Sequence, residues 1–348
     1  MATSNTSRIV QAGGWKPALA LVIIAPMVGE LLTSSAPPLV FFVPWVFLVF
    51  ALLYGCGALL IRELMTRAGK GWPSILLLGA AYGILEEGIG AKSFFDPKWR
   101  AIGPLGVHGR AYGVNWIWTL DLILLHAAFC IGLSILTVQL IFPKQESQPW
   151  LGRGPLLAVA ILYGLDLLLL YQKGGSYAAP AAGYAACFVA VTGLVAAAFL
   201  WRGPLSAGLR KSAPTLQGPA WRFGALGFSA AAVYILQMYY LPSLGLSPWL
   251  SAALVVGLAL FCANRLVAWT RSGASFSADE RFWLVAGAFG FFALLAPLQE
   301  INPSRPDSGR GMALVGIGTA GFLYWLRRRV APRRDEPRFL AQLQEGRE

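Results

Sequence analysis

The sequence predicts an all-α fold, a polytopic transmembrane helical bundle of about ten spans. Of its residues, 57% are hydrophobic and only 13% are charged, and the mean hydropathy is +0.60. A soluble domain carries roughly a quarter charged residues and could not bury so much apolar surface. The apolar residues form runs of about 20 residues, the length that crosses a bilayer. Tryptophans near many of the run ends fit the preference of this side chain for membrane interfaces.

The apolar runs define the predicted spans, several of which begin at a proline. In chain order they are 17–34, 38–61, 73–95, 114–142, 155–171, 179–201, 223–241, 248–269, 282–299 and 312–327.

Positive charges are concentrated in alternate connections between the spans, which predicts that both termini are cytoplasmic. Arg62, Arg67 and Lys70 follow the second span and indicate a cytoplasmic helix end, and the tail at 331–348 is basic. Loop 91–114 belongs to the opposite, less basic set. The net charge of +12 lies in these short segments, which indicates contact with the lipid bilayer and no nucleic-acid partner. We expect a multi-pass protein of a prokaryotic plasma membrane.

Ionisable residues inside the predicted spans divide the chain unevenly. Most of them lie in residues 1–145, which we expect to form a four-helix unit that carries the charged cluster. Residues 146–330 are expected to form a supporting set of six helices, and residues 331–348 a basic cytoplasmic tail.

An ionisable residue inside a bilayer costs at least about 2.5–3.5 kcal/mol on insertion scales, so each one is a candidate functional residue. These residues are Glu30, Glu86, Glu87, Asp121 and His126. At about 1.5 Å per residue, the paired glutamates lie about 13 Å inside the outer end of the third span, and Asp121 and His126 lie about 9 and 16 Å deep in the fourth. Spans joined in sequence are usually neighbours, so we expect the carboxylates and the imidazole at one level.

These residue types are the parts needed for hydrolysis inside a membrane. Two adjacent carboxylates in a dry site cannot both ionise easily, so one of Glu86 and Glu87 is expected to act as a general base. Asn115 and His126 share one helical stripe and could stabilise an oxyanion or orient water, whereas Asp121 points about 140° away from His126. The supporting residues are expected to be Glu30, Lys92 and Asp121.

The sequence indicates no cofactor, although a metal at the acidic cluster stays open. Glu86, Glu87, Asp121 and His126 offer hard oxygen ligands and one imidazole. The sequence has no His-Glu-x-x-His, Gly-x-Ser-x-Gly or phosphate-binding glycine loop, which argues against the usual zinc proteases, serine hydrolases and nucleotide-driven pumps.

The pair Glu86-Glu87 in a glycine-rich apolar helix, followed one span later by His126, resembles the start of the glutamic intramembrane proteases. These are the CAAX-processing and bacteriocin-processing superfamily, also called abortive-infection proteins. The resemblance implies that Glu86 or Glu87 activates water, that His126 and an amide side chain stabilise the oxyanion, and that the substrate is a peptide or membrane protein.

The chain departs from the motifs of that superfamily at several positions. The arginine that ends the double-glutamate motif is replaced by Ala91, with Lys92 next to it, and the phenylalanine four residues before the histidine is Leu122. The third motif needs a further intramembrane histidine, but the only other histidine, His108, lies in a loop.

We therefore expect a membrane-embedded hydrolase that resembles an intramembrane protease. Two alternatives use the same residues differently: a proton- or cation-coupled transporter, and a non-catalytic membrane scaffold. In the scaffold, Lys92 or Arg110 would neutralise the glutamates and the buried charges would only fix helix packing.

Overall fold

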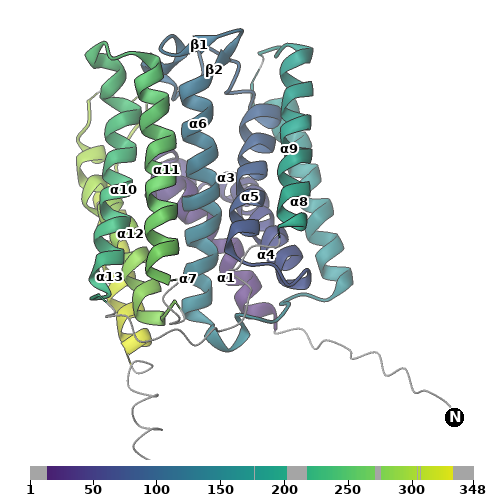
Figure 1. Cartoon of the computed structure of the whole chain (residues 1–348), viewed down its shortest axis with the longest axis vertical. Coiled ribbons are helices and arrows are strands. Elements are labelled where there is room, and N and C mark those ends of the chain that lie inside the picture. Colours follow the sequence, from purple (N-terminus) through teal and green to yellow (C-terminus); the bar gives the residue numbers. More distant parts are fainter. Residues whose placement is uncertain are drawn as a thin grey trace, which may run out of the picture.

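The computed structural model describes residues 14–175, 177–201, 218–270, 276–303, 305 and 307–331. Long helices run roughly parallel through the molecule (Figure 1), and the all-α prediction is confirmed. The basic tail from residue 332 onward lies outside the described residues.

The first half of the chain forms helices that change their winding part of the way along. They are α1 (Trp15–Pro26) with η1 (Met27–Leu32), α2 (Pro38–Phe41), α3 (Pro44–Phe50) with η2 (Ala51–Cys56) and α4 (Gly57–Arg67), α5 (Trp72–Gly83) with η3 (Ile84–Gly90), and α6 (Trp116–Leu124) with η5 (Leu125–Leu133) and α7 (Ser134–Ile141). The segments η1, η2, η3 and η5 are π-helical. Each of them continues an α-helix without a break in the chain.

The second half consists of longer, regular α-helices. They are α8 (Arg153–Lys173), α9 (Ala181–Leu200), α10 (Trp221–Tyr239), α11 (Pro248–Thr270), α12 (Ala278–Glu300) and α13 (Met312–Val330). The connections add the short 3₁₀ turns η4 (Gly103–Gly106), η6 (Pro143–Gln145) and η7 (Leu241–Leu244), and the paired strands β1 (Arg110–Ala111) and β2 (Val114–Asn115).

Within the described ranges, seven helical segments are long and apolar enough to cross a membrane. They are Trp15–Leu32, Pro44–Arg67, Trp116–Ile141, Arg153–Lys173, Ala181–Leu200, Pro248–Thr270 and Ala278–Glu300. The other three predicted spans coincide with helices at Trp72–Gly90, Trp221–Tyr239 and Met312–Val330. A membrane protein with several spans is therefore supported, and the count of ten stays a prediction.

The second predicted span, 38–61, is wrong in its boundaries. The chain makes the short helix α2 and then restarts at Pro44, and the span continues to Arg67. Proline has no backbone N–H and favours the first turn of a helix, so Pro44 begins a new helix more readily than it continues an old one.

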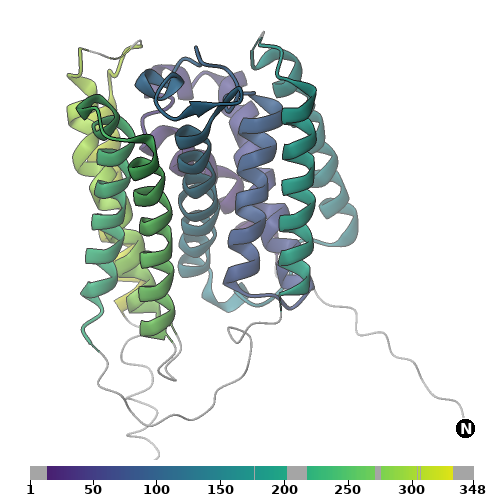
Figure 2. The same ribbon diagram turned by 45° about the horizontal axis from the view of Figure 1, so that its top comes forward.

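The helices of residues 1–145 lie in the middle of the bundle (Figures 1 and 2). Helices α8 and α9 lie on one side and contact η3, whereas α10 to α13 lie on the other, where α12 contacts α7. The described chain begins at α1 and ends at α13 on the side opposite the β1–β2 hairpin. This arrangement agrees with termini on one face of the membrane, and which face is cytoplasmic stays a prediction.

A buried charge pair lies in the middle of α4, at the segment that the sequence predicts to be a cytoplasmic helix end. Arg62 and Glu63 are 1% and 0% exposed, and the guanidinium lies 2.6 Å from the carboxylate. Arg62 also donates to the carbonyls of Gln145 and Glu146, and Glu63 accepts from the backbone N–H of Trp150. The pair thus fixes the connection that follows α7 against α4.

Candidate functional site

All four π-helical segments in the described part of the chain carry residues of one cluster. Glu30 lies in η1, Tyr54 in η2, Glu86 and Glu87 in η3, and His126 in η5. A π-helical turn holds one residue more than an α-helical turn, with poorer hydrogen-bond geometry, and such turns are frequent at functional sites. Their convergence on one place marks this place as the candidate site.

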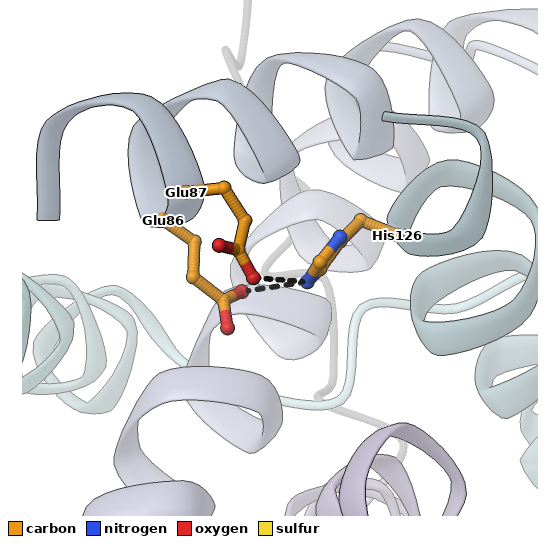
Figure 3. A group of neighbouring side chains, drawn as sticks. All are labelled: Glu86, Glu87 and His126. Carbon is orange, nitrogen blue, oxygen red and sulfur yellow. Dashed lines mark ion pairs between the residues drawn. The ribbon is translucent and has the colours of Figure 1, made fainter. Parts of the chain in front are cut away.

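The centre of the site is an imidazole facing two carboxylates (Figure 3). Nε2 of His126 lies 3.2 Å from Oε2 of Glu86 and 3.9 Å from Oε1 of Glu87. The side chains of His126 and Glu86 are only 2% and 5% exposed, whereas that of Glu87 is 14% exposed. Glu87 is therefore the most accessible of the three side chains.

A second layer of aromatic and acidic groups surrounds the imidazole. The hydroxyl of Tyr54 donates to Oε1 of Glu30 at 2.7 Å. The ring of Tyr54 stacks on that of His126, with centroids 6.1 Å apart and planes 14° apart, and Tyr82 lies 5.8 Å from His126. These contacts leave the imidazole little freedom to turn.

Glu87 is positioned by a chain of donors from α6. Nε1 of Trp118 donates to the hydroxyl of Ser93 at 3.0 Å, and this hydroxyl donates to Oε2 of Glu87. One carboxylate oxygen is thereby occupied, and the other faces His126. Ser93 lies three residues after the end of η3, so the chain folds back there and its hydroxyl orients Glu87.

Close approach of two helices brings His126 beside the glutamates. A Cβ atom at Gly83 would lie 2.9 Å from Cβ of His126, and one at Gly79 would lie 2.8 Å from Cα of Ala127. Only glycine allows this separation, because any side chain at these positions of α5 would push η5 away.

The basic residues expected to neutralise the glutamates bind elsewhere. Nζ of Lys92 donates to the carbonyls of Tyr171 and Gly175, at 2.7 and 2.9 Å, and so caps the end of α8. Arg110 donates to the side chain of Asn115. Among the described residues, the one basic side chain within 4 Å of the Glu86 and Glu87 carboxylates is the imidazole of His126.

Asn115 does not join the cluster, contrary to the expected stripe. Its amide donates to the carbonyls of Ser93 and Asp96, so it pins the loop that follows η3. Asn115 lies in β2, before the helix begins, and eleven residues of helix place it about 16 Å from the level of His126. A stripe shared with His126 would need a helix that already includes residue 115.

The remaining acids lie inside the bundle at some distance from the centre. Asp121 faces α10, where Gln237 donates to its carboxylate and the Tyr234 hydroxyl donates to its backbone carbonyl. Asp166 is 3% exposed and is the one buried residue of α8, with Oδ2 lacking a hydrogen-bond partner among the described residues. Asp121 thus has a structural partner, and Asp166 is the one buried residue of a helix whose other residues are partly or fully exposed.

Sequence reasoning missed Tyr54, Tyr82 and Ser93. Buried tyrosines in apolar spans look like core residues, and nothing in their spacing indicates which acid or imidazole they face on another helix. For Ser93 a signal existed, since a hydroxyl six residues after Glu87 can fold back at the end of a helix.

A family model matches residues 19–269 and is described as an uncharacterized membrane protein family. The match covers the whole cluster, including Glu30, Glu86 and His126. Searches of curated proteins and of solved structures give no significant match.

Proposed function

The chain belongs to this uncharacterized membrane protein family, and we propose that it is a membrane-embedded hydrolase. The observation that carries the proposal is the convergence of Glu86, Glu87 and His126. A carboxylate oxygen of each glutamate and a ring nitrogen of the histidine lie within 4.8 Å of one another in a buried site. Groups within this distance can act together on one water molecule.

The proposed chemistry divides the roles between the acids and the imidazole. Glu86 or Glu87 takes a proton from water as the water oxygen attacks the carbonyl carbon of a peptide bond. The same carboxyl group returns this proton to the amide nitrogen as the carbon–nitrogen bond breaks. His126 orients that water through Nε2, the ring nitrogen that faces the two carboxylates. Asn115 has no part in this scheme, because it holds the loop.

The burial of the site favours a substrate that comes from the membrane. Helix α8 packs against η2 and η3, and of its residues only Asp166 is buried, so α8 lies between the cluster and the outside of the bundle. A transmembrane peptide could reach the cluster by displacing this helix. We therefore propose a membrane protein or peptide as substrate, in agreement with the resemblance to glutamic intramembrane proteases.

The test measures hydrolysis in a whole mixture of membrane proteins, so that no single substrate has to be chosen. The full chain is incubated with detergent-solubilised membranes in water labelled with heavy oxygen, and peptide carboxyl ends are examined by mass spectrometry. Hydrolysis leaves one solvent oxygen in each new carboxyl group, so the native chain should label peptides that a Glu86→Gln, Glu87→Gln double variant does not. Equal labelling by the two proteins would refute the proposal.

A cation-coupled transporter is the second candidate, since several interior acids in the described chain have no lysine or arginine partner. Glu30, Asp121 and Asp166 share this property with the two central glutamates. Transport predicts uptake into proteoliposomes that depends on an ion gradient and leaves the substrate unchanged. A scaffold predicts that the double variant lowers only the abundance of the protein.

A further inference from the structure

The tautomer of His126 is fixed by a backbone hydrogen bond. Nδ1 lies 2.7 Å from the carbonyl oxygen of Leu122. A carbonyl can only accept, so Nδ1 carries the hydrogen and, in the neutral ring, Nε2 carries a lone pair. That lone pair faces the two glutamates.

Three electron-pair donors therefore meet with no hydrogen bond between them. Nε2 of His126 and Oε2 of Glu86 are 3.2 Å apart, yet each lacks a hydrogen-bond partner among the described residues. Both side chains are more than nine-tenths buried. Unpartnered acceptors that face one another in a buried site repel unless a proton or a metal ion lies between them. A proton on Nε2 would be expected to donate to a glutamate, and Nε2 makes no hydrogen bond among the described residues.

We propose that Glu86, Glu87 and His126 bind a divalent transition-metal ion, such as zinc. Bonds of about 2.0–2.2 Å from nitrogen and oxygen ligands set neighbouring ligand atoms roughly 3–4 Å apart. The measured separations of 3.2 and 3.9 Å from Nε2 fall in this range. An ion about 2.1 Å from both Nε2 and Oε2 would lie about 40° off the line that joins these two atoms, so the site does not need a direct hydrogen bond between them.

The outer contacts of the three side chains match those of metal ligands. Metal-binding histidines usually donate their other N–H to a carbonyl or carboxylate, as His126 does to Leu122. Ligating carboxylates are themselves hydrogen-bonded, as Glu87 is to Ser93. Since Lys92 binds backbone carbonyls instead, a dication would also neutralise the two glutamates.

This inference rests on the proposed function and deepens it: in the loaded site the ion, and not a free glutamate, would activate the water that the hydrolase uses. Glu30 supplies a matched control. It is a carboxylate of the same cluster, but it bonds to Tyr54 and lies outside the group of three ligand atoms.

The test uses the full chain in detergent, stripped with a chelator and then titrated with zinc or cobalt(II). We expect a bound ion by elemental analysis and visible cobalt absorption bands in the native protein. Glu86→Gln and His126→Ala should lose both signals, Glu30→Gln should keep them, and Ser93→Ala should weaken binding by about 10–100-fold. Circular dichroism and size-exclusion chromatography show which variants are folded.

The two proposals can fail separately. If the folded native chain binds no more zinc, cobalt or manganese than the Glu86→Gln, Glu87→Gln double variant, the metal site is refuted, even where hydrolysis is observed. If native protein binds the ion and the variants do not, the metal site stands, even where no labelled peptide appears.

Discussion

Replacing Gly83 with alanine tests the close helix contact on which the site depends. The added Cβ would lie 2.9 Å from Cβ of His126 and 3.3 Å from its Cγ. Carbon atoms in favourable contact are about 3.5–4.0 Å apart, so His126 would have to retreat by roughly 0.6–1.1 Å. Tyr54 stacks on its ring and Leu122 holds its Nδ1, and both contacts oppose this movement.

The expected cost can be worked out from these distances. Overpacking a closely packed position costs about 1–3 kcal/mol, whereas exchanging glycine for alanine within a helix returns about 0.5–1 kcal/mol. Gly290→Ala is the matched control, because a Cβ there meets nothing within 4 Å. Gly83→Ala should therefore be less stable than Gly290→Ala by about 1–3 kcal/mol. A displacement of about 1 Å at the imidazole should also lower hydrolysis by up to about a hundredfold.

The measurement is equilibrium unfolding of both variants in mixed micelles, followed by tryptophan fluorescence, together with the heavy-oxygen labelling assay. Equal stability and equal labelling in Gly83→Ala and Gly290→Ala would show that α5 and η5 do not approach so closely, and the geometry given for the site would then be wrong.

Two further predictions concern stability and topology. Glu63→Gln should destabilise the protein by about 3–5 kcal/mol, because it leaves Arg62 buried without its counter-charge. As a comparison, Arg281→Ala breaks a partly exposed pair with Glu146 and should cost about 0–1 kcal/mol in the same unfolding assay. Equal losses of stability in the two variants would contradict the burial of Arg62. A reporter fused after Gly106 should be active only on the non-cytoplasmic side, and cytoplasmic activity would overturn the predicted orientation.

The positions of the helices were predictable because a helix that crosses a membrane needs an apolar run of about 20 residues, and such runs are visible in the sequence. The range 155–171 corresponds to Arg153–Lys173, and 312–327 corresponds to Met312–Val330. The errors lie where local chemistry interrupts a run. Pro44 restarts the second span, and the third ends at Gly90 instead of residue 95, where the chain turns back to bring Ser93 to Glu87.

Depth along neighbouring spans was enough to predict that His126 meets Glu86 and Glu87. It could not predict the Tyr54 contact with Glu30, because hydropathy does not encode which faces of non-adjacent spans meet. The π-helical winding was also hidden, since a wider turn leaves the apolar composition of a span unchanged.

Because the site residues lie in π-helical segments, the site could be lost while the helices that carry it remain in place. Each wide turn amounts to one residue inserted into an α-helix, so deleting a single residue from Ile84–Gly90 would restore regular winding and rotate the residues after the deletion by about 100°. The span would keep its length to within about 1.5 Å and its apolar character. A one-residue deletion is thus a short evolutionary route by which a related protein could keep this bundle in the membrane and lose its chemistry.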